Sequence, residues 1–201
     1  MSDLVAELQN LDLRLLLLVN HARSPLLDHV MKNISDFGLF FPVVAAFIIY
    51  RLIRGDWPER VMWLVGVLAV VSSDALCARI LKPLVGRQRP FVDVDHLYVL
   101  KGSKWLITDP GLRARLGPSL SWPSCHATNM WTAASYVFCF MPRAGAVVAV
   151  IAMVVCYSRV YLGVHYPLDT LGGLLVGLFW GVLFAFLTKS FNRLFLASRS
   201  K

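Results

Sequence analysis

The sequence predicts an all-α integral membrane protein, a bundle of five transmembrane helices preceded by interfacial amphipathic helices. Two observations support this fold class. The 201 residues are 57% hydrophobic and 16% charged, whereas soluble domains average roughly 45–50% apolar and about 25% charged residues. The apolar residues also gather in runs of near membrane-crossing length, separated by polar connections. A chain of this length is expected to form one domain.

Residues 1–33 are predicted to form interfacial helices rather than a span. Apolar residues recur there near helical spacing, but Arg14 interrupts them, and the unbroken apolar run is too short to cross about 30 Å of hydrocarbon. The first helix is expected to end near Asn20, and Ser24-Pro25 to open a second. The alternatives are a frayed polar terminus and a sixth span through residues 11–30.

The first two spans are expected within residues 34–82. The first clear apolar segment covers residues 37–50 and stops at a short polar connection. The second starts at residue 61 and continues past two charged residues to Lys82. The stretch 83–126 is polar, contains several prolines and glycines, and is predicted to be an extracytoplasmic loop.

The last three spans are expected within residues 127–188. They cover residues 127–141, 146–157 and 170–188, and the last of these has 19 residues without a charge. That length is close to the roughly 20 residues that a spanning helix needs. Residues 189–201 are predicted to form a basic cytoplasmic tail.

The positive-inside rule orients this bundle in the plasma (inner) membrane. Basic residues of the short connections and the tail fall on one side, which is therefore cytoplasmic: Arg51, Arg54, Arg60, Arg143, Lys189, Arg193, Arg199 and Lys201. The stretches 83–126 and 158–169 then share the extracytoplasmic side, although the longer one carries basic residues too. The net charge of +8 favours anionic head groups or a phosphorylated substrate over nucleic acid, because the charges lie between apolar runs.

The four cysteines predict no disulfide framework. Cys77, Cys139 and Cys156 fall inside apolar runs, and only Cys125 lies in a polar region. Cysteines distributed in this way do not have the spacing of a small disulfide-stapled domain.

Three polar clusters fall at the extracytoplasmic border, and the first covers residues 82–90. Lys82 closes a span, and Arg89 follows it by seven positions, so two cations stand at one membrane border. Arginine offers a planar fork to phosphate oxygens and lysine a point charge. Taken alone, basic residues beside a span are usually interfacial anchors.

The second cluster covers residues 121–126, directly before the third predicted span. A serine and the backbone at a helix start offer a hydroxyl and N–H groups to an anion. His126 can donate a proton to a leaving oxygen, since an unperturbed histidine titrates near pH 6.5. The alternative for this cluster alone is an N-capped helix with an interfacial histidine.

The third cluster covers residues 158–169. His165 and Asp169 are four positions apart and share one face if a helix starts near Pro167. An aspartate bonded to one ring nitrogen fixes the tautomer and leaves the other nitrogen free to attack. Arg159 adds a third cation. A capped helix start with a structural histidine is the alternative, and it is the joint occurrence of three clusters that favours a catalytic site.

Together the clusters resemble the signature of the type-2 phosphatidic acid phosphatase superfamily. That signature is Lys-x6-Arg-Pro, then Pro-Ser-Gly-His, then Ser-Arg-x5-His-x3-Asp. The first and third motifs match without exception, and the resemblance covers roughly residues 60–188. The one departure is Cys125 where the family usually has glycine, which puts close approach of the backbone to a phosphate in doubt.

The resemblance implies a role for each residue of the signature. His165 would attack phosphorus to form a phosphohistidine, Asp169 would orient it, and His126 would protonate the leaving group and later activate water. The phosphate oxygens would be held by Lys82, Arg89, Ser124, the backbone N–H of Cys125, and Arg159. The family uses no metal, and no cofactor is expected.

The sequence therefore predicts a membrane lipid phosphatase that acts on a lipid phosphate or diphosphate in the bilayer. A polyprenyl diphosphate such as undecaprenyl diphosphate is the favoured substrate. Phosphatidylglycerol phosphate, phosphatidic acid and lipid A 1-phosphate are alternatives, as is phosphoryl transfer to another lipid. The alternative from another functional class is a lipid-binding or transport protein that does not catalyse hydrolysis. No nucleic acid and no obligatory protein partner are expected.

Overall fold

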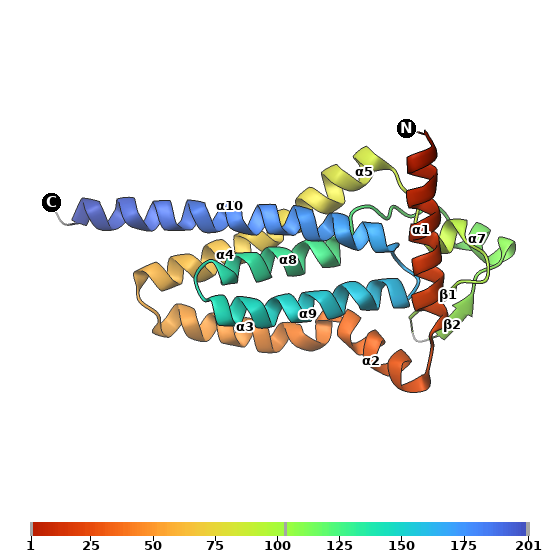
Figure 1. Ribbon diagram of the computed structural model, residues 1–201. Helices are drawn as coiled ribbons and strands as arrows, with labels where there is room; N and C mark the ends of the chain where they lie inside the picture. Colours follow the sequence, from red (N-terminus) through yellow and green to blue (C-terminus); the bar gives the residue numbers. More distant parts are fainter. Residues whose placement is uncertain (1, 103, 200–201) are drawn as a thin grey trace.

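The computed structural model describes residues 2–102 and 104–199, and most of them are helical (Figure 1). The helices are α1 (Ser2–His21), α2 (Pro25–Ser35), α3 (Phe37–Arg54), α4 (Trp57–Leu76), the π-helical turn η1 (Cys77–Leu81), α5 (Lys82–Val85), α6 (Pro90–Asp93), α7 (Pro110–Leu116), α8 (Cys125–Phe138), α9 (Pro142–Tyr161) and α10 (Pro167–Arg199). Two strands, β1 (Tyr98–Lys101) and β2 (Lys104–Ile107), form an antiparallel hairpin.

Helix α8 lies at the centre of the bundle and contacts α4, α9 and α10. Its contact with α10 is close because α10 presents Gly173, Gly177 and Gly181, one glycine every four residues, to α8. A Cβ at Gly177 would lie 2.5 Å from the carbonyl oxygen of Thr128, and one at Gly181 would lie 2.1 Å from Ser135 Oγ. Small residues at this spacing let two membrane helices approach until their backbones touch.

Among the described residues, four helical segments are long and apolar enough to cross a membrane. They are Pro25–Arg54, Trp57–Val85, Pro142–Tyr161 and Pro167–Ala197. These segments match four of the five predicted spans. The fifth, predicted over residues 127–141, corresponds to α8, whose 14 residues reach only about 21 Å. The count of five stays a prediction, and the alternative span through residues 11–30 is interrupted between α1 and α2.

The long loop contains the β1–β2 hairpin, which the sequence analysis did not predict within the helical fold. Val99 of β1 is buried in a cluster that includes Leu16 of α1. The side-chain amide of Asn20 accepts a hydrogen bond from Tyr98 N (2.9 Å) and donates to the carbonyls of Tyr98 (2.8 Å) and Tyr161 (2.8 Å). A lone hairpin is marginally stable, so the hairpin depends on α1 and α9, which lie far away in the sequence.

Helix α10 also differs from the prediction at its end. Residues 189–201 were expected to form a tail, but the helix continues without a break to Arg199. No proline or glycine occurs among residues 189–199, so no helix-breaking residue ends α10 at the predicted boundary. Figure 1 shows this end of α10 projecting beyond the bundle, opposite the end that α1 and the hairpin cover.

Candidate active site

The first and second motifs meet because the segments that carry them pair side by side. Arg89 N donates to the carbonyl of Ser119 (2.8 Å), and Ser121 N donates to the carbonyl of Arg87 (2.7 Å). Lys82, at the end of the second span, reaches the same segment and donates from Nζ to the carbonyl of Ser121 (3.0 Å). Backbone pairing therefore holds Lys82 and Arg89 beside the loop that leads into α8.

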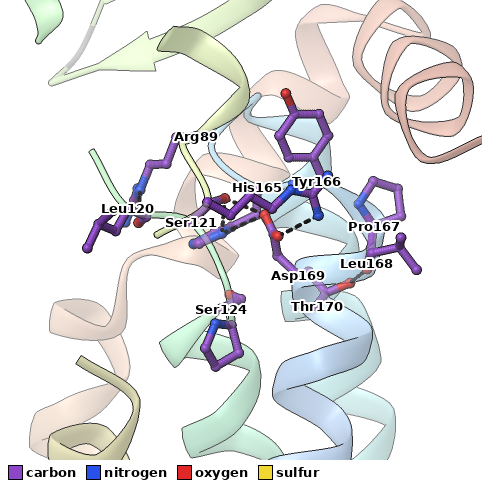
Figure 2. Close-up of polar contacts among 12 residues, drawn as sticks. Arg89, Leu120, Ser121, Ser124, His165, Tyr166, Pro167, Leu168, Asp169 and Thr170 are labelled. Carbon is purple, nitrogen blue, oxygen red and sulfur yellow. Dashed lines mark hydrogen bonds and ion pairs between the residues drawn. The ribbon is translucent and has the colours of Figure 1, made fainter. Parts of the chain in front are cut away.

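The third motif meets the other two at the start of α10. Asp169 Oδ2 accepts a hydrogen bond from Tyr166 N (2.8 Å) and lies 3.3 Å from His165 Nδ1. The Ser121 hydroxyl donates to the same carboxylate oxygen, and Ser124 N donates to the carbonyl of Asp169 (3.0 Å). Figure 2 shows His165 and Asp169 converging with Ser121 where the loop passes the start of α10. Two elements far apart in sequence thus hold one carboxylate against one imidazole.

His165 is buried and lies in a positive electrostatic environment. Burial lowers the pKa of His165 well below its ordinary value, and the positive charges of Arg89, Arg159 and Lys82 lower it further. The ring is therefore neutral at neutral pH. With Nδ1–H directed to Asp169, the lone pair is on Nε2, which is the nitrogen suited to attack.

Two buried polar atoms of the predicted site have no hydrogen-bond partner among the described residues. They are Ser124 Oγ and Arg159 Nε. A terminal nitrogen of Arg159 donates to Ser35 Oγ of α2, which fixes the guanidinium. His126 lies in the first turn of α8, close enough to Arg159 and His165 to interact with both electrostatically. Buried polar groups usually have hydrogen-bond partners. Ser124 Oγ and Arg159 Nε are therefore suited to donate hydrogen bonds to the oxygens of a bound anion.

The structure thus brings together the side chains predicted for the site from α5, α8, α9, α10 and the loops between helices: Lys82, Arg89, Ser124, His126, Arg159, His165 and Asp169. Cys125 lies in the same place, and its backbone N–H belongs to the first turn of α8. The N-terminus of a helix carries partial positive charge and exposed N–H groups, so the predicted use of the Cys125 backbone is compatible with its position.

The cysteine side chains differ from the prediction, because Cys77 and Cys125 form a disulfide. The sequence analysis expected no disulfide framework and did not predict this single bridge. Cys77 starts the π-helical turn η1, which lies against α8. The pairing is invisible in the sequence because it depends on how α4 packs against α8 over a separation of 48 residues.

We expect the double variant Cys77→Ala/Cys125→Gly to unfold at a lower temperature and to keep its catalytic activity within several-fold. Closing a loop of 48 residues restricts the unfolded chain by about 4 kcal/mol at most, whereas glycine keeps the backbone N–H at position 125. Thermal unfolding in detergent, with and without reductant, measures the first effect.

The matched control for this variant is Cys139→Ala, because Cys139 is a free cysteine. Reductant should shift the unfolding of the wild type and of Cys139→Ala alike, and should leave the double variant unchanged. A double variant that is as stable as the wild type, or one that is folded but inactive, contradicts the expectation.

Sequence reasoning missed three residues that support the site. Ser121 lies in the second cluster, two positions before its motif, and contacts both His165 Nδ1 (3.3 Å) and Asp169. Arg87 lies inside the first motif and pairs with Asp169, and Asp12 of α1 pairs with Arg87. A signal for Asp12 does exist in the sequence, because a carboxylate between two leucines in an apolar helix is expected to have a buried partner.

Comparisons with known proteins identify the family of the chain. Residues 60–193 match the PAP2 superfamily. The lipid A 4'-phosphatase of Bacteroides thetaiotaomicron is 30% identical over 187 residues, which cover 90% of this chain and 78% of that protein. The undecaprenyl-diphosphatase of Sulfolobus acidocaldarius is 29% identical over 166 residues, which cover 80% and 70% of the two chains.

A solved structure shares the fold. The crystal structure of the first transmembrane PAP2 type phosphatidylglycerolphosphate phosphatase from Bacillus subtilis has a TM-score of 0.60 and 25% identity, and the match covers 93% of this chain and 87% of that one. The resemblance drawn from the three motifs is confirmed. The chain belongs to the PAP2 superfamily and is a membrane lipid phosphatase of that type.

Proposed function

We propose that this phosphatase cleaves the phosphate or diphosphate of a membrane lipid through a phosphohistidine on His165, using side chains alone and no metal. One observation carries the proposal. A neutral imidazole lies against Asp169 and within a group of cations, next to Ser124 Oγ and Arg159 Nε, which have no partner in the described part of the chain. An anion with several oxygens satisfies those atoms and meets the nucleophile in the same place.

The proposed reaction has two displacements at phosphorus. His165 Nε2 attacks, the bond from phosphorus to the leaving oxygen breaks, and His126, which takes up a proton when the anionic substrate binds beside it, gives that proton to the leaving oxygen. His126 then takes a proton from water, which attacks the phosphohistidine and releases phosphate and His165. Lys82, Arg89, Ser124 and Arg159 stabilise the charge on the equatorial oxygens in both steps. Asp169 keeps the imidazole in one tautomer and stabilises its charged form.

We infer that α1 lies at the membrane surface above this site. Its buried face carries Asp12, Leu16 and Asn20, while leucines occupy the exposed face: Leu4, Leu8, Leu11, Leu15 and Leu18. A helix at a protein surface in water buries its apolar face and exposes its polar face, whereas α1 exposes leucines and buries Asp12 and Asn20. In Figure 1, α1 crosses the end of the bundle instead of running along it, as a helix in the interfacial plane does.

We also propose that the site faces the extracytoplasmic side of the plasma membrane. The Cys77–Cys125 disulfide lies at the site, and disulfides persist in oxidising compartments. The positive-inside rule supports the same orientation, because Arg54 and Arg143 flank connections at the other end of the bundle. Within this scheme the predicted segments 1–33, 34–82, 83–126, 127–188 and 189–201 form one domain.

A polyprenyl diphosphate is the proposed substrate, with a lipid A phosphate as the second candidate. The first is supported by the compact chain and by the relative described as an undecaprenyl-diphosphatase. The second is supported by the lipid A 4'-phosphatase, whose similarity covers 90% of this chain. The same residues can hydrolyse phosphatidylglycerol phosphate or phosphatidic acid, which differ in the group attached to phosphorus. They can also transfer the phosphoryl group to a lipid, in which case only the acceptor differs.

A panel of lipids in detergent distinguishes these substrates. We expect purified protein to release phosphate from undecaprenyl diphosphate with a kcat/KM at least about tenfold above that for lipid A, phosphatidylglycerol phosphate and phosphatidic acid, a difference of about 1.4 kcal/mol in transition-state binding. The rates are measured with and without a metal chelator. A preference for lipid A supports the second candidate, loss of activity with chelator contradicts the metal-free mechanism, and release from no lipid contradicts hydrolysis.

A further inference from the structure

The N-terminal helix reaches the proposed active site through one buried carboxylate. Asp12 of α1 is almost fully buried, and its Oδ2 accepts a hydrogen bond from Arg87 (2.6 Å). Its other oxygen accepts a hydrogen bond from Leu168 N (2.8 Å), in the first turn of α10. Asp12 therefore holds two separate segments of the site at once.

Arg87 connects Asp12 to the residue that orients His165. One terminal nitrogen of Arg87 pairs with Asp12 and the other donates to Asp169 Oδ1 (2.9 Å), so its planar fork bridges two fully buried carboxylates. The guanidinium also lies 4.0 Å from the centroid of the Tyr166 ring. These contacts keep Arg87 on the far side of Asp169 from His165, because His165 meets the other oxygen, Oδ2, of that carboxylate.

We propose that Asp12 is a positioning residue of the phosphatase, acting through Arg87 and Asp169 to hold His165 in line for attack. The chain of contacts runs from α1 to Arg87, from Arg87 to Asp169, and from Asp169 to the imidazole. Asp12 lies outside the segment 60–193 that matches the family, so this support is supplied by a part of the chain that the family signature does not include. The inference rests on the proposed roles of His165 and Asp169.

The physical reason is that the other contacts of the Asp169 carboxylate hold only one of its oxygens. Ser121, Tyr166 N and His165 all meet Oδ2, so without Arg87 the carboxylate can still turn about that oxygen. An arginine that is itself anchored at Asp12 fixes the second oxygen and thereby the plane of the carboxylate. Second-layer groups that fix a reacting group in this way typically contribute about 10–100-fold to activity in metal sites.

Asp12→Asn tests the role, because the amide oxygen still accepts from Leu168 N while the negative charge that pairs with Arg87 is removed. We expect kcat to fall about 10–100-fold with KM unchanged within about twofold, because the residues proposed to hold phosphate are untouched. The assay uses the lipid of the panel that the wild type hydrolyses fastest. Glu7→Gln is the matched control, an exposed carboxylate on the same helix, and should leave kcat unchanged.

A double-mutant cycle separates positioning from a merely structural role. If Asp12 acts through Arg87, the double variant Asp12→Asn/Arg87→Gln should have the kcat of Arg87→Gln alone, whereas independent effects multiply. Arg87→Lys serves as well if Asp12→Asn does not fold, since one ammonium cannot bridge two carboxylates as a fork does, and kcat should fall with KM unchanged.

The outcomes are distinct. Wild-type kcat in Asp12→Asn, multiplicative effects in the cycle, or a change in KM alone would each overturn the role of Asp12. His165→Ala is measured in parallel. An active His165→Ala overturns the proposed function itself, whereas an inactive His165→Ala beside a fully active Asp12→Asn overturns only this inference.

Discussion

His165→Ala is expected to lower kcat for phosphate release by at least about 10³-fold, with the protein still folded. The proposed mechanism has no other nucleophile, because the cations and the hydroxyl around the phosphate bind oxygen and do not attack phosphorus. The imidazole is neutral, since burial and the nearby positive charges lower the pKa of His165. Removing the ring therefore removes the attacking lone pair and leaves the anion site in place.

A covalent test accompanies this variant. In the wild type, rapid alkaline quenching and mass spectrometry should find phosphate on His165, and His126→Ala, which lacks both the proposed acid of the first step and the proposed base of the second, should form and lose this phosphate more slowly. His29→Ala is the matched control. His29 is exposed on α2, contacts Asn33 (3.0 Å) and has no part in the proposed mechanism. Wild-type release by His165→Ala, or a phosphate found on another residue, contradicts the mechanism.

Arg159→Ala is expected to lower kcat/KM by about 10²–10³-fold, the usual loss when one group that stabilises transition-state charge is removed. Arg159 has a buried Nε without a partner among the described residues, and its terminal nitrogen is fixed by Ser35. The guanidinium is thus already aimed before substrate arrives. Arg159→Lys should recover little, because an ammonium cannot present several nitrogens in one plane.

Arg143→Ala is the matched control for Arg159, since both arginines belong to α9 and lie at its opposite ends. Arg143 is exposed and should be replaceable without loss of kcat/KM. Steady-state rates in detergent, together with thermal unfolding of each variant, provide the measurement. Equal effects of the two substitutions, or full activity of Arg159→Lys, would show that Arg159 does not bind the phosphate as a fork.

Sequence alone predicted the family, four spans that have counterparts among the apolar helices, and most residues of the proposed site. Long apolar runs predict membrane helices because backbone polar groups must bond within the segment when no water is present. The three motifs were informative because each fixes residue types at short spacing along the chain, as in the turn from His165 to Asp169, where Pro167 starts α10. Such local geometry is encoded within about a dozen residues.

Only the tertiary structure decided which distant elements support those motifs. The hairpin was missed because β1 depends on Asn20 and Leu16 of α1 for its partners and cover, and the Cys77–Cys125 disulfide was missed because it joins two helices. Asp12 lies outside every motif, yet it reaches Asp169 through Arg87. Buried polar groups need partners wherever those partners lie along the chain, so the sequence determined the reacting groups, while the packing of α1, α8 and α10 determined what holds them.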